Sequence, residues 1–530
     1  MSFEVRYSDL AGRIGKLETA HGVLETPAFI PVVHPVRQTI SPRFLKNLGF
    51  NGLITNAYTA LKYYGDKARV KGIHDILNYD GVIMTDSGGY QILEYGAINA
   101  EPAVISEFER DIGSDISVPL DKPTGYGIKY EKAKDYVEET LANAKDTLAI
   151  EFEGRTVGRK DCEQDHDNQS TTIWVGPVQG AEHLDLVRYC ANALDKMGFP
   201  VLAIGSPVEV MEAYEFSVLA QMIATVKRTV PTKPIHLFGA GHPLTIPLAV
   251  SLGCDMFDSA SYMLYAKDDR YMHSNGTFKL QDLSYLTCQC PVCCTHTIKE
   301  LRQMSRVDRT EEIAKHNLYV LKAEVDTVRQ AIVDGRLWEY VMLKARAHPK
   351  LMKAMDLFKN FEFLEDGTPM FKGKAVFLYE PIDQYRPEAR RFRKIVSTFR
   401  SVERKKLLLY PIMKIQPFYS TRDFVQLVKK FPDAQICVYN QFLGVIPVEI
   451  CDIFPAAHHM SSATAPGKPH HAKDYPTFIE SLDNFLVYNT FGEITIVADD
   501  FMHDLIYNYS YQDKLNAKVL DYKEDIIFEL

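Results

Sequence analysis

The amino-acid sequence predicts a (β/α)8 barrel over residues 1–345, followed by smaller α+β domains. Three observations favour this fold. Short apolar runs recur between residues 26 and 257, helical patterns separate them, and the runs are too apolar to alternate with polar residues. Strands of this kind are covered on both faces, and the intervening helices make them parallel. Eight such units suit a closed barrel better than an open sheet.

The predicted strands follow one another, each bounded by turn-forming residues. They are Thr26–Val33, Gly52–Thr55, Val82–Thr85, Ile116–Leu120, Thr172–Val178, Val201–Ile204, Ile235–Phe238 and Cys254–Phe257. Apolar residues at three- and four-residue spacing predict helices between them. These helices are Ala103–Ile112, Tyr130–Glu151, His183–Met197, Val208–Lys227 and His242–Leu252. A doubly wound open sheet is the alternative, but no G-x-G-x-x-G motif opens a helix after the first strand, which disfavours a dinucleotide-binding fold.

Composition and charge exclude several classes of protein. The chain has 530 residues, of which 46% are hydrophobic and 24% charged, as in ordinary globular proteins. It contains no apolar run of about 18 residues, the length a membrane span needs, and no basic-then-apolar secretion signal, so we expect a cytoplasmic protein. The net charge of -9 excludes a uniformly basic nucleic-acid coat but is compatible with a locally basic RNA-binding surface.

Polar or small residues stand where the predicted strands end, and the carboxyl ends of barrel strands are where chemistry occurs. These residues are Asn56, Asp86, Asp121, Gln179, Gly205 and Asp258. A single aspartate after a strand is commonly a helix cap or a turn former. Three carboxylates with a carboxamide and exposed glycine backbone instead suit a flat polar heterocycle, on whose face Tyr90 would stack.

Carboxylates in such a group also suit chemistry at a sugar anomeric carbon. One carboxylate can attack that carbon to give a covalent glycosyl-enzyme intermediate, while a second handles protons. The sequence alone does not show which aspartate takes which role.

Four cysteines lie within seven residues after the last predicted strand. Cys288, Cys290 and Cys293 form a C-x-C-x2-C loop that predicts a structural zinc ion, with a cysteine or histidine from a following element as fourth ligand. His296 and His316 are the candidates, and we favour His316 because a helix that returns across the loop can present it to the metal. The alternatives are buried reduced cysteines without metal, or a redox pair at Cys290 and Cys293, in which a third spaced cysteine has no role.

Six motifs in order resemble the queuine/archaeosine tRNA-guanine transglycosylases, and the resemblance covers about residues 1–346. The motifs are T-D-S-G-G-Y-Q (Thr85–Gln91), P-L-D-K-P-T (Pro119–Thr124), G-P-V-Q-G (Gly176–Gly180), L-F-G-A-G-H-P (Leu237–Pro243), D-M-F-D-S-A-S-Y (Asp255–Tyr262) and the cysteine cluster. The stretch F-D-S-A-S-Y, with Tyr265–Met272 after it, is similar to the archaeal branch. Bacterial members tend to carry Cys and Met-Pro after this aspartate.

The resemblance implies exchange of guanine at position 15 of the tRNA D-loop for 7-cyano-7-deazaguanine (preQ0), on the route to archaeosine. By motif match, Asp258 is the nucleophile on ribose C1′ and Asp86 the general acid/base, although some descriptions of the archaeal branch assign the nucleophile to Asp86. Asp121, Gln179 and the Gly205 backbone bind the purine edge. Tyr90 stacks on the base, which must be extruded from the tRNA core.

The same resemblance implies a structural zinc ion on Cys288, Cys290, Cys293 and His316, and a homodimer. Archaeal members typically end with a PUA RNA-binding domain, whereas this chain stops about where one would begin. We therefore expect a separately encoded PUA-domain protein to act in trans. The competing functions are an archaeosine-synthase-like amidinotransferase and a noncatalytic tRNA-binding subunit. Such paralogues lose the barrel aspartates, so the aspartates retained in this chain argue against both.

We expect the zinc subdomain at about residues 280–335, one α+β domain at 346–430, with a tRNA contact, and a second at 431–530. The segment Arg386–Lys406 carries nine positive charges against two glutamates. It is either a solvated face or a phosphate-binding patch.

Overall fold

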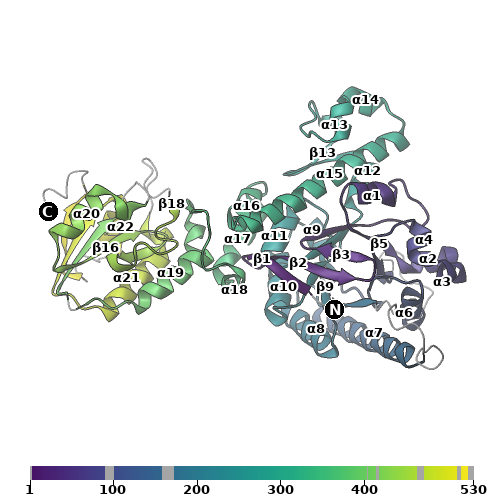
Figure 1. The fold of residues 1–530 in the computed structure, drawn as a ribbon, viewed down its shortest axis with the longest axis horizontal. Coiled ribbons are helices and arrows are strands. Elements are labelled where there is room, and N and C mark those ends of the chain that lie inside the picture. Colours follow the sequence, from purple (N-terminus) through teal and green to yellow (C-terminus); the bar gives the residue numbers. More distant parts are fainter. Residues whose placement is uncertain are drawn as a thin grey trace. The chain divides into compact units, whose positions relative to one another are not determined.

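The computed structural model describes residues 3–89, 101–157, 172–402, 404–412, 417–461, 471–509 and 515–522. Tyr90 lies outside these residues. The chain divides into two compact units, one of Met1–Val333 with Tyr340–Leu357 and one of Asp334–Glu339 with Phe358–Leu530 (Figure 1). Among the described residues, no helix combines the length and the apolar character that crossing a membrane requires.

The first unit contains an eight-stranded parallel sheet in the order β4-β11-β10-β9-β8-β7-β6-β5. Its strands are β4 (Ala28–Pro31), β5 (Gly52–Asn56), β6 (Val82–Asp86), β7 (Ile116–Ser117), β8 (Ile173–Val178), β9 (Val201–Ile204), β10 (Ile235–Leu237) and β11 (Met256–Ser259). A parallel bridge between Val32 and Ile54 joins the two edge strands and closes the sheet. The predicted (β/α)8 barrel is confirmed, and each of its eight predicted strands is present.

Helices connect the barrel strands. They are α1 (Pro42–Asn47), α2 (Ala57–Tyr64), α3 (Asp66–Lys71), α4 (Ile73–Leu77), α6 (Pro102–Asp111), α7 (Tyr130–Val157), α8 (Leu184–Met197), α9 (Pro207–Glu212), α10 (Phe216–Thr229), α11 (Thr245–Ser251) and α12 (Ser261–Lys267). Helix α8 shows why they form: Leu186, Cys190 and Leu194 recur on its buried face, and Gly198 ends it with a φ of 95°. The predicted single helix Val208–Lys227 is wrong, because Tyr214 takes a positive φ of 56° between α9 and α10.

A three-stranded antiparallel sheet that the sequence did not predict covers the amino-terminal end of the barrel. It comprises β1 (Phe3–Asp9), β2 (Gly12–Thr19) and β3 (Gly22–Glu25), drawn in purple in Figure 1. Leu17 and Leu24 from this sheet belong to the same buried cluster as Val82 and Ile116, the first residues of two barrel strands. The polar residues at the strand ends therefore lie at the opposite, carboxyl end of the barrel.

The cysteine cluster follows the barrel in a subdomain built on one long helix. This part contains β12 (Arg270–His273), β13 (Gly276–Lys279), α13 (Pro291–Thr295), α14 (Ile298–Gln303) and α15 (Arg306–Val333), and then α16 (Leu337–Ala345) and α17 (Pro349–Met355). Helix α15 packs against α12, β12 and α13. Its buried face includes Ile313, Leu321 and Val328, and His316 lies on that face near the cysteines.

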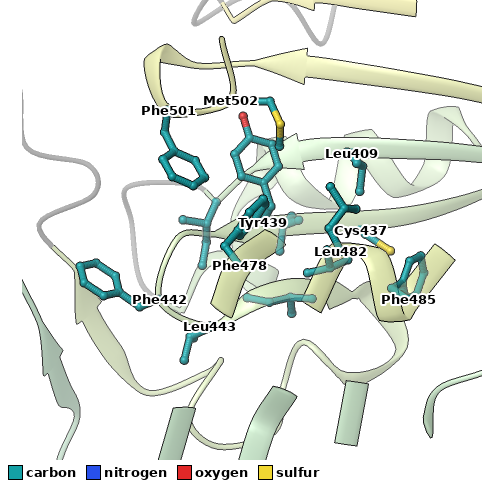
Figure 2. Close-up of a cluster of buried hydrophobic side chains, with 14 of the residues drawn as sticks. Leu409, Cys437, Tyr439, Phe442, Leu443, Phe478, Leu482, Phe485, Phe501 and Met502 are labelled. Atoms are coloured by element: carbon teal, nitrogen blue, oxygen red, sulfur yellow. The ribbon is translucent and has the colours of Figure 1, made fainter. Parts of the chain in front are cut away.

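The second unit is organised around a five-stranded sheet in the order β17-β16-β15-β19-β20. The strands are β15 (Lys406–Pro411), β16 (Ala434–Asn440), β17 (Gly444–Pro447), β19 (Glu493–Ala498) and β20 (Lys518–Asp521), with α19 (Pro387–Thr398), α20 (Arg422–Lys430), α21 (Pro476–Tyr488) and α22 (Asp500–Tyr509) among the helices. β15 pairs with both β16 and β19, so residues on the two sides of position 430 share one sheet. Figure 2 shows their common core, in which Tyr439 lies with Phe478, Leu482 and Phe485.

The arginine-rich segment is largely internal to this unit. Arg386 is fully buried, and its guanidinium lies 2.7 Å from Glu339 and 3.2 Å from Glu388. Three further side chains donate hydrogen bonds to backbone carbonyls: Arg390, Arg391 and Arg393. These four arginines stabilise the fold, so the phosphate-binding interpretation of the segment does not apply to them.

Candidate active site and metal centre

Asp86 and Asn56 end two neighbouring barrel strands and stand opposite each other in the parallel register. Nδ2 of Asn56 donates to Oδ2 of Asp86 over 3.2 Å, and Oδ1 of Asn56 accepts from the backbone N–H of Thr59 at 2.7 Å. The second bond caps helix α2 and fixes the orientation of the amide, because only its NH2 group is then left to face Asp86.

Asp258 lies in β11, next to His236 in β10. Oδ1 of Asp258 accepts hydrogen bonds from Nε2 of His236 at 2.8 Å and from the backbone N–H of Gly239 at 3.2 Å. Nδ1 of His236 is buried and has no hydrogen-bond partner among the described residues. A proton on Nδ1 would be unsatisfied, whereas a proton on Nε2 is donated to Asp258. Both donors bind Oδ1 rather than Oδ2.

Asp121 and Gln179 form a second pair. Nε2 of Gln179 donates to Oδ2 of Asp121 over 2.6 Å. Oε1 of Gln179 accepts from the backbone and hydroxyl of Thr124, at 3.0 and 2.8 Å, and from the hydroxyl of Ser206 at 2.9 Å. The carboxamide oxygen is therefore saturated, and its NH2 group is directed toward the carboxylate side.

Two glycines allow backbone to lie directly against this pair. A Cβ at Gly205 would stand 2.2 Å from Nε2 of Gln179, and a Cβ at Gly89 would stand 2.1 Å from Oδ1 of Asp121. Any side chain at either position would displace a polar group. The N–H of Gly205 donates to the carbonyl of Val178 at 2.9 Å and so is already engaged. The absence of a side chain at Gly205 thus leaves the room that the amide of Gln179 occupies.

The three carboxylates influence one another electrostatically. Burial and the nearby charge of Asp258 raise the pKa of Asp86 to about 6. Burial and the charge of Asp86 raise the pKa of Asp121 to about 7. Because neighbouring like charges disfavour full ionisation, the carboxyl groups of Asp86 and Asp121 keep their protons to a higher pH than an isolated aspartate does. The structure thus brings Asp86 close enough to both Asp121 and Asp258 for their charges to interact.

His236 was not among the predicted site residues. It lies inside the predicted apolar strand Ile235–Phe238 and is fully buried, as a core residue would be. Its contact with Asp258 on the adjacent strand brings it into the site. A histidine within such a short apolar strand was the available signal.

The predicted metal ligands form a compact group. Cys288, Cys290, Cys293 and His316 place their ligand atoms within 4.8 Å of one another. Sγ of Cys290 lies 3.5 Å from Sγ of Cys293, and Nδ1 of His316 lies 3.4 Å from both sulfurs. Ligands around a tetrahedral zinc ion, with bonds of about 2.0–2.3 Å, are about 3.5–3.8 Å apart, so the group fits zinc.

Neighbouring groups orient the histidine for this role. Nε2 of His316 donates to the carbonyl of Met272 at 2.8 Å, which directs Nδ1 toward the sulfurs. The ring of Tyr271 stacks on that of His316 at 3.7 Å. The competing candidate His296 instead lies 3.6 Å from Glu312. The fourth ligand position thus belongs to His316, as the sequence analysis favoured.

Comparison with known proteins gives a consistent result. The family described as queuine tRNA-ribosyltransferase matches residues 9–350. A tRNA-guanine(15) transglycosylase of Aeropyrum pernix is 40% identical over 465 residues, which are 86% of this chain and 86% of that protein. A tRNA-guanine(15) transglycosylase of Methanosarcina acetivorans is 38% identical over 523 residues, which are 97% of each chain. A tRNA-guanine(15) transglycosylase of Sulfolobus acidocaldarius is 38% identical over 458 residues, which are 86% of this chain and 87% of that protein. With the barrel and the Cys3His group it contains, this chain belongs to the queuine tRNA-ribosyltransferase family.

Proposed function

We propose that the chain is a tRNA-guanine(15) transglycosylase that replaces guanine 15 of tRNA by 7-cyano-7-deazaguanine. Relatives with that name cover up to 97% of the chain. The observation that carries the proposal is the electrostatic coupling of Asp86 to Asp121 and Asp258 at the carboxyl end of the barrel. Base exchange at a ribose carbon needs this combination of a nucleophile, a proton donor and an acceptor for the base.

In the first step, Oδ2 of Asp258 attacks C1′ of the nucleotide, and the bond from C1′ to the guanine nitrogen breaks. Its electron pair passes to guanine, and Asp86 supplies the proton that neutralises the leaving base. The raised pKa of Asp86, about 6 through burial and the charge of Asp258, suits a group that must hold this proton near neutral pH. The ribose stays attached to Asp258, so the phosphate backbone is not broken.

In the second step, the incoming base loses a proton to Asp86, attacks C1′ and displaces Asp258. Negative charge then returns to the carboxylate of Asp258. The donors on its Oδ1, His236 and the N–H of Gly239, are already in place to stabilise that charge. Such preorganised donors act most strongly where charge develops in the transition state. His236 is therefore a positioning residue of the proposed mechanism.

Asp121 and Gln179 are the proposed readers of the purine. A carboxylate accepts hydrogen bonds from purine N–H groups, and the amide NH2 of Gln179 donates to a purine carbonyl. The saturated Oε1 of Gln179 prevents the amide from presenting its oxygen instead. Gly205 contributes by leaving room for this amide. Stacking of the base on Tyr90 stays a prediction from the sequence.

We further propose that Cys288, Cys290, Cys293 and His316 hold one structural zinc ion. Four protein ligands leave no open coordination position, so the ion stabilises the subdomain and takes no part in base exchange. The homodimer, the separate PUA-domain protein and a tRNA contact by the second unit also remain predictions. Sedimentation of the purified chain tests the first of these.

The deciding experiment measures incorporation of labelled guanine and of labelled 7-cyano-7-deazaguanine into unmodified tRNA. We expect both to be incorporated by the native chain and neither by the Asp258→Asn variant. An amidinotransferase-like paralogue or a noncatalytic tRNA-binding subunit would incorporate neither base even with Asp258 intact. Incorporation of guanine alone would retain the exchange reaction but contradict the proposed incoming base.

A further inference from the structure

A second group of potential metal ligands lies at the amino-terminal end of the barrel, away from the catalytic carboxylates. It consists of His21 in the turn between β2 and β3, His74 in α4, and Asp115 immediately before β7. Their ligand atoms all lie within 4.8 Å of one another. The three residues come from three separate elements, so the fold itself brings them together.

The geometry resembles that of a preformed binding site. Nδ1 of His21 lies 2.9 Å from Oδ1 of Asp115, and Nε2 of His74 lies 3.1 Å from Oδ2. The two imidazole rings lie 3.7 Å apart. Backbone N–H groups of His21 and Ile83 also donate to the carboxylate, at 3.0 and 2.9 Å, and fix its orientation. These backbone bonds are the outer contacts that usually hold a metal-binding carboxylate in place.

The ion-pair partners of Asp115 differ from those of Asp255, a second buried aspartate that precedes a strand of the same barrel. Asp255, immediately before β11, likewise accepts a hydrogen bond from the first residue of a neighbouring strand, Ile235, and is paired with the guanidinium of Arg13 at 2.6 Å. Asp115 is just as buried, and its ion-pair partners among the described residues are the two histidines alone. Asp115 therefore lies beside two imidazoles, where Asp255 lies beside a guanidinium.

We propose that His21, His74 and Asp115 bind a zinc ion that is distinct from the ion of the cysteine cluster. Imidazole and carboxylate together are typical zinc ligands, whereas magnesium avoids imidazole. Ligands of a tetrahedral zinc ion with bonds of about 2.1 Å are about 3.4 Å apart, and each histidine nitrogen lies 2.9 or 3.1 Å from the carboxylate oxygen that it faces. The side chain of His21 is 42% exposed and lies in a turn, which gives the ion a route from solvent. The ion would connect the β1–β3 sheet to helix α4 and to the start of β7.

The test counts zinc in the untagged full-length chain by mass spectrometry of the metal, after equilibration with zinc and desalting. We expect two zinc ions per native chain and one in His21→Ala, a substitution at a partly exposed turn that leaves the barrel core intact. His503→Ala is the matched control, because His503 pairs with the carboxylate of Asp521 at 3.1 Å and belongs to no group of three potential ligands among the described residues. We expect that variant to keep two ions.

A thermal melt gives an independent measurement. Added zinc should raise the melting temperature of the native chain and of His503→Ala more than that of His21→Ala, and added magnesium should have no such effect. Equal zinc counts in the native chain and His21→Ala would overturn the proposal, whether or not the cysteine cluster holds its own ion. Neither measurement uses base exchange, so the result is independent of the proposed function.

Discussion

Replacing His236 tests the proposed role of the hydrogen bond on Asp258. His236→Leu removes the donor at 2.8 Å and leaves Oδ1 of Asp258 with the N–H of Gly239 as its remaining donor among the described residues. A hydrogen bond to a charged group contributes about 1.5–3 kcal/mol. If that contribution is made as charge returns to Asp258, its loss slows turnover about 10- to 150-fold, since about 1.4 kcal/mol corresponds to a factor of ten.

His236→Gln is the matched variant, because the amide of glutamine can place an N–H near the position of Nε2. We expect it to recover most of the rate that His236→Leu loses. The assay is steady-state incorporation of labelled guanine into tRNA, with kcat and KM for the base determined separately. His236 contacts neither Asp121 nor Gln179 in the described structure, so kcat should fall while KM for the base stays unchanged. Thermal melts and zinc counts of both variants control for misfolding.

Two results would refute this reasoning. The first is a kcat for His236→Leu within about twofold of the native value, because a bond of that strength cannot be removed without a larger effect. The second is an equal loss in the Leu and Gln variants of His236, which would indicate a packing role rather than hydrogen bonding to Asp258.

Three further predictions concern other parts of the molecule. Gly205→Ala places a Cβ 2.2 Å from Nε2 of Gln179 and so displaces this amide. We expect KM for guanine to rise about tenfold or more. An unchanged KM would contradict the proposed role of Gly205. Cys290→Ser should lose one zinc per chain and melt at a lower temperature. Cys294→Ser changes an exposed cysteine outside the ligand group and should do neither. Equal zinc counts in the two variants would contradict the proposed zinc site. Burial and Asp258 raise the pKa of Asp86 from 3.8 to about 6, so the stability that a protonated Asp86 provides is lost as the pH rises through about 6. The free energy of unfolding of Asp86→Asn should therefore exceed that of the native chain by roughly 1–3 kcal/mol near about pH 8, and by less near about pH 4. Denaturant unfolding at the two pH values measures this difference. The opposite pH trend would contradict the proposed rise in the pKa of Asp86.

The barrel was predictable because each of its strands leaves a local signal in the sequence. A strand covered on both faces is a short apolar run, and its carboxyl end is marked by the residue that follows, such as Asp86 or Gln179. The ligand His316 was predictable for a similar reason, since a helix following a cysteine loop can return a side chain to it. In each case the decisive information lies within one or two adjacent elements.

The features that the sequence did not reveal depend on contacts between distant segments. The β1–β3 sheet was missed because β1 is mostly exposed and lacks an apolar run. Arg386 belongs to a run of basic residues, and its burial beside Glu339 follows from packing that composition does not show. The contact between His236 and Asp258 depends on the register of β10 against β11. The group of His21, His74 and Asp115 likewise joins elements that are far apart in the chain.

The proposed mechanism requires Asp258 to attack the ribose and to carry it between the two bases. The most direct test is to trap the covalent complex of native chain and tRNA by denaturing it during turnover, digest it, and locate the ribosylated residue by mass spectrometry. We expect the nucleotide to be attached to Asp258, in the peptide that contains β11, and we expect no adduct in Asp258→Asn. A nucleotide attached to Asp86, or an adduct that persists in Asp258→Asn, would contradict this mechanism.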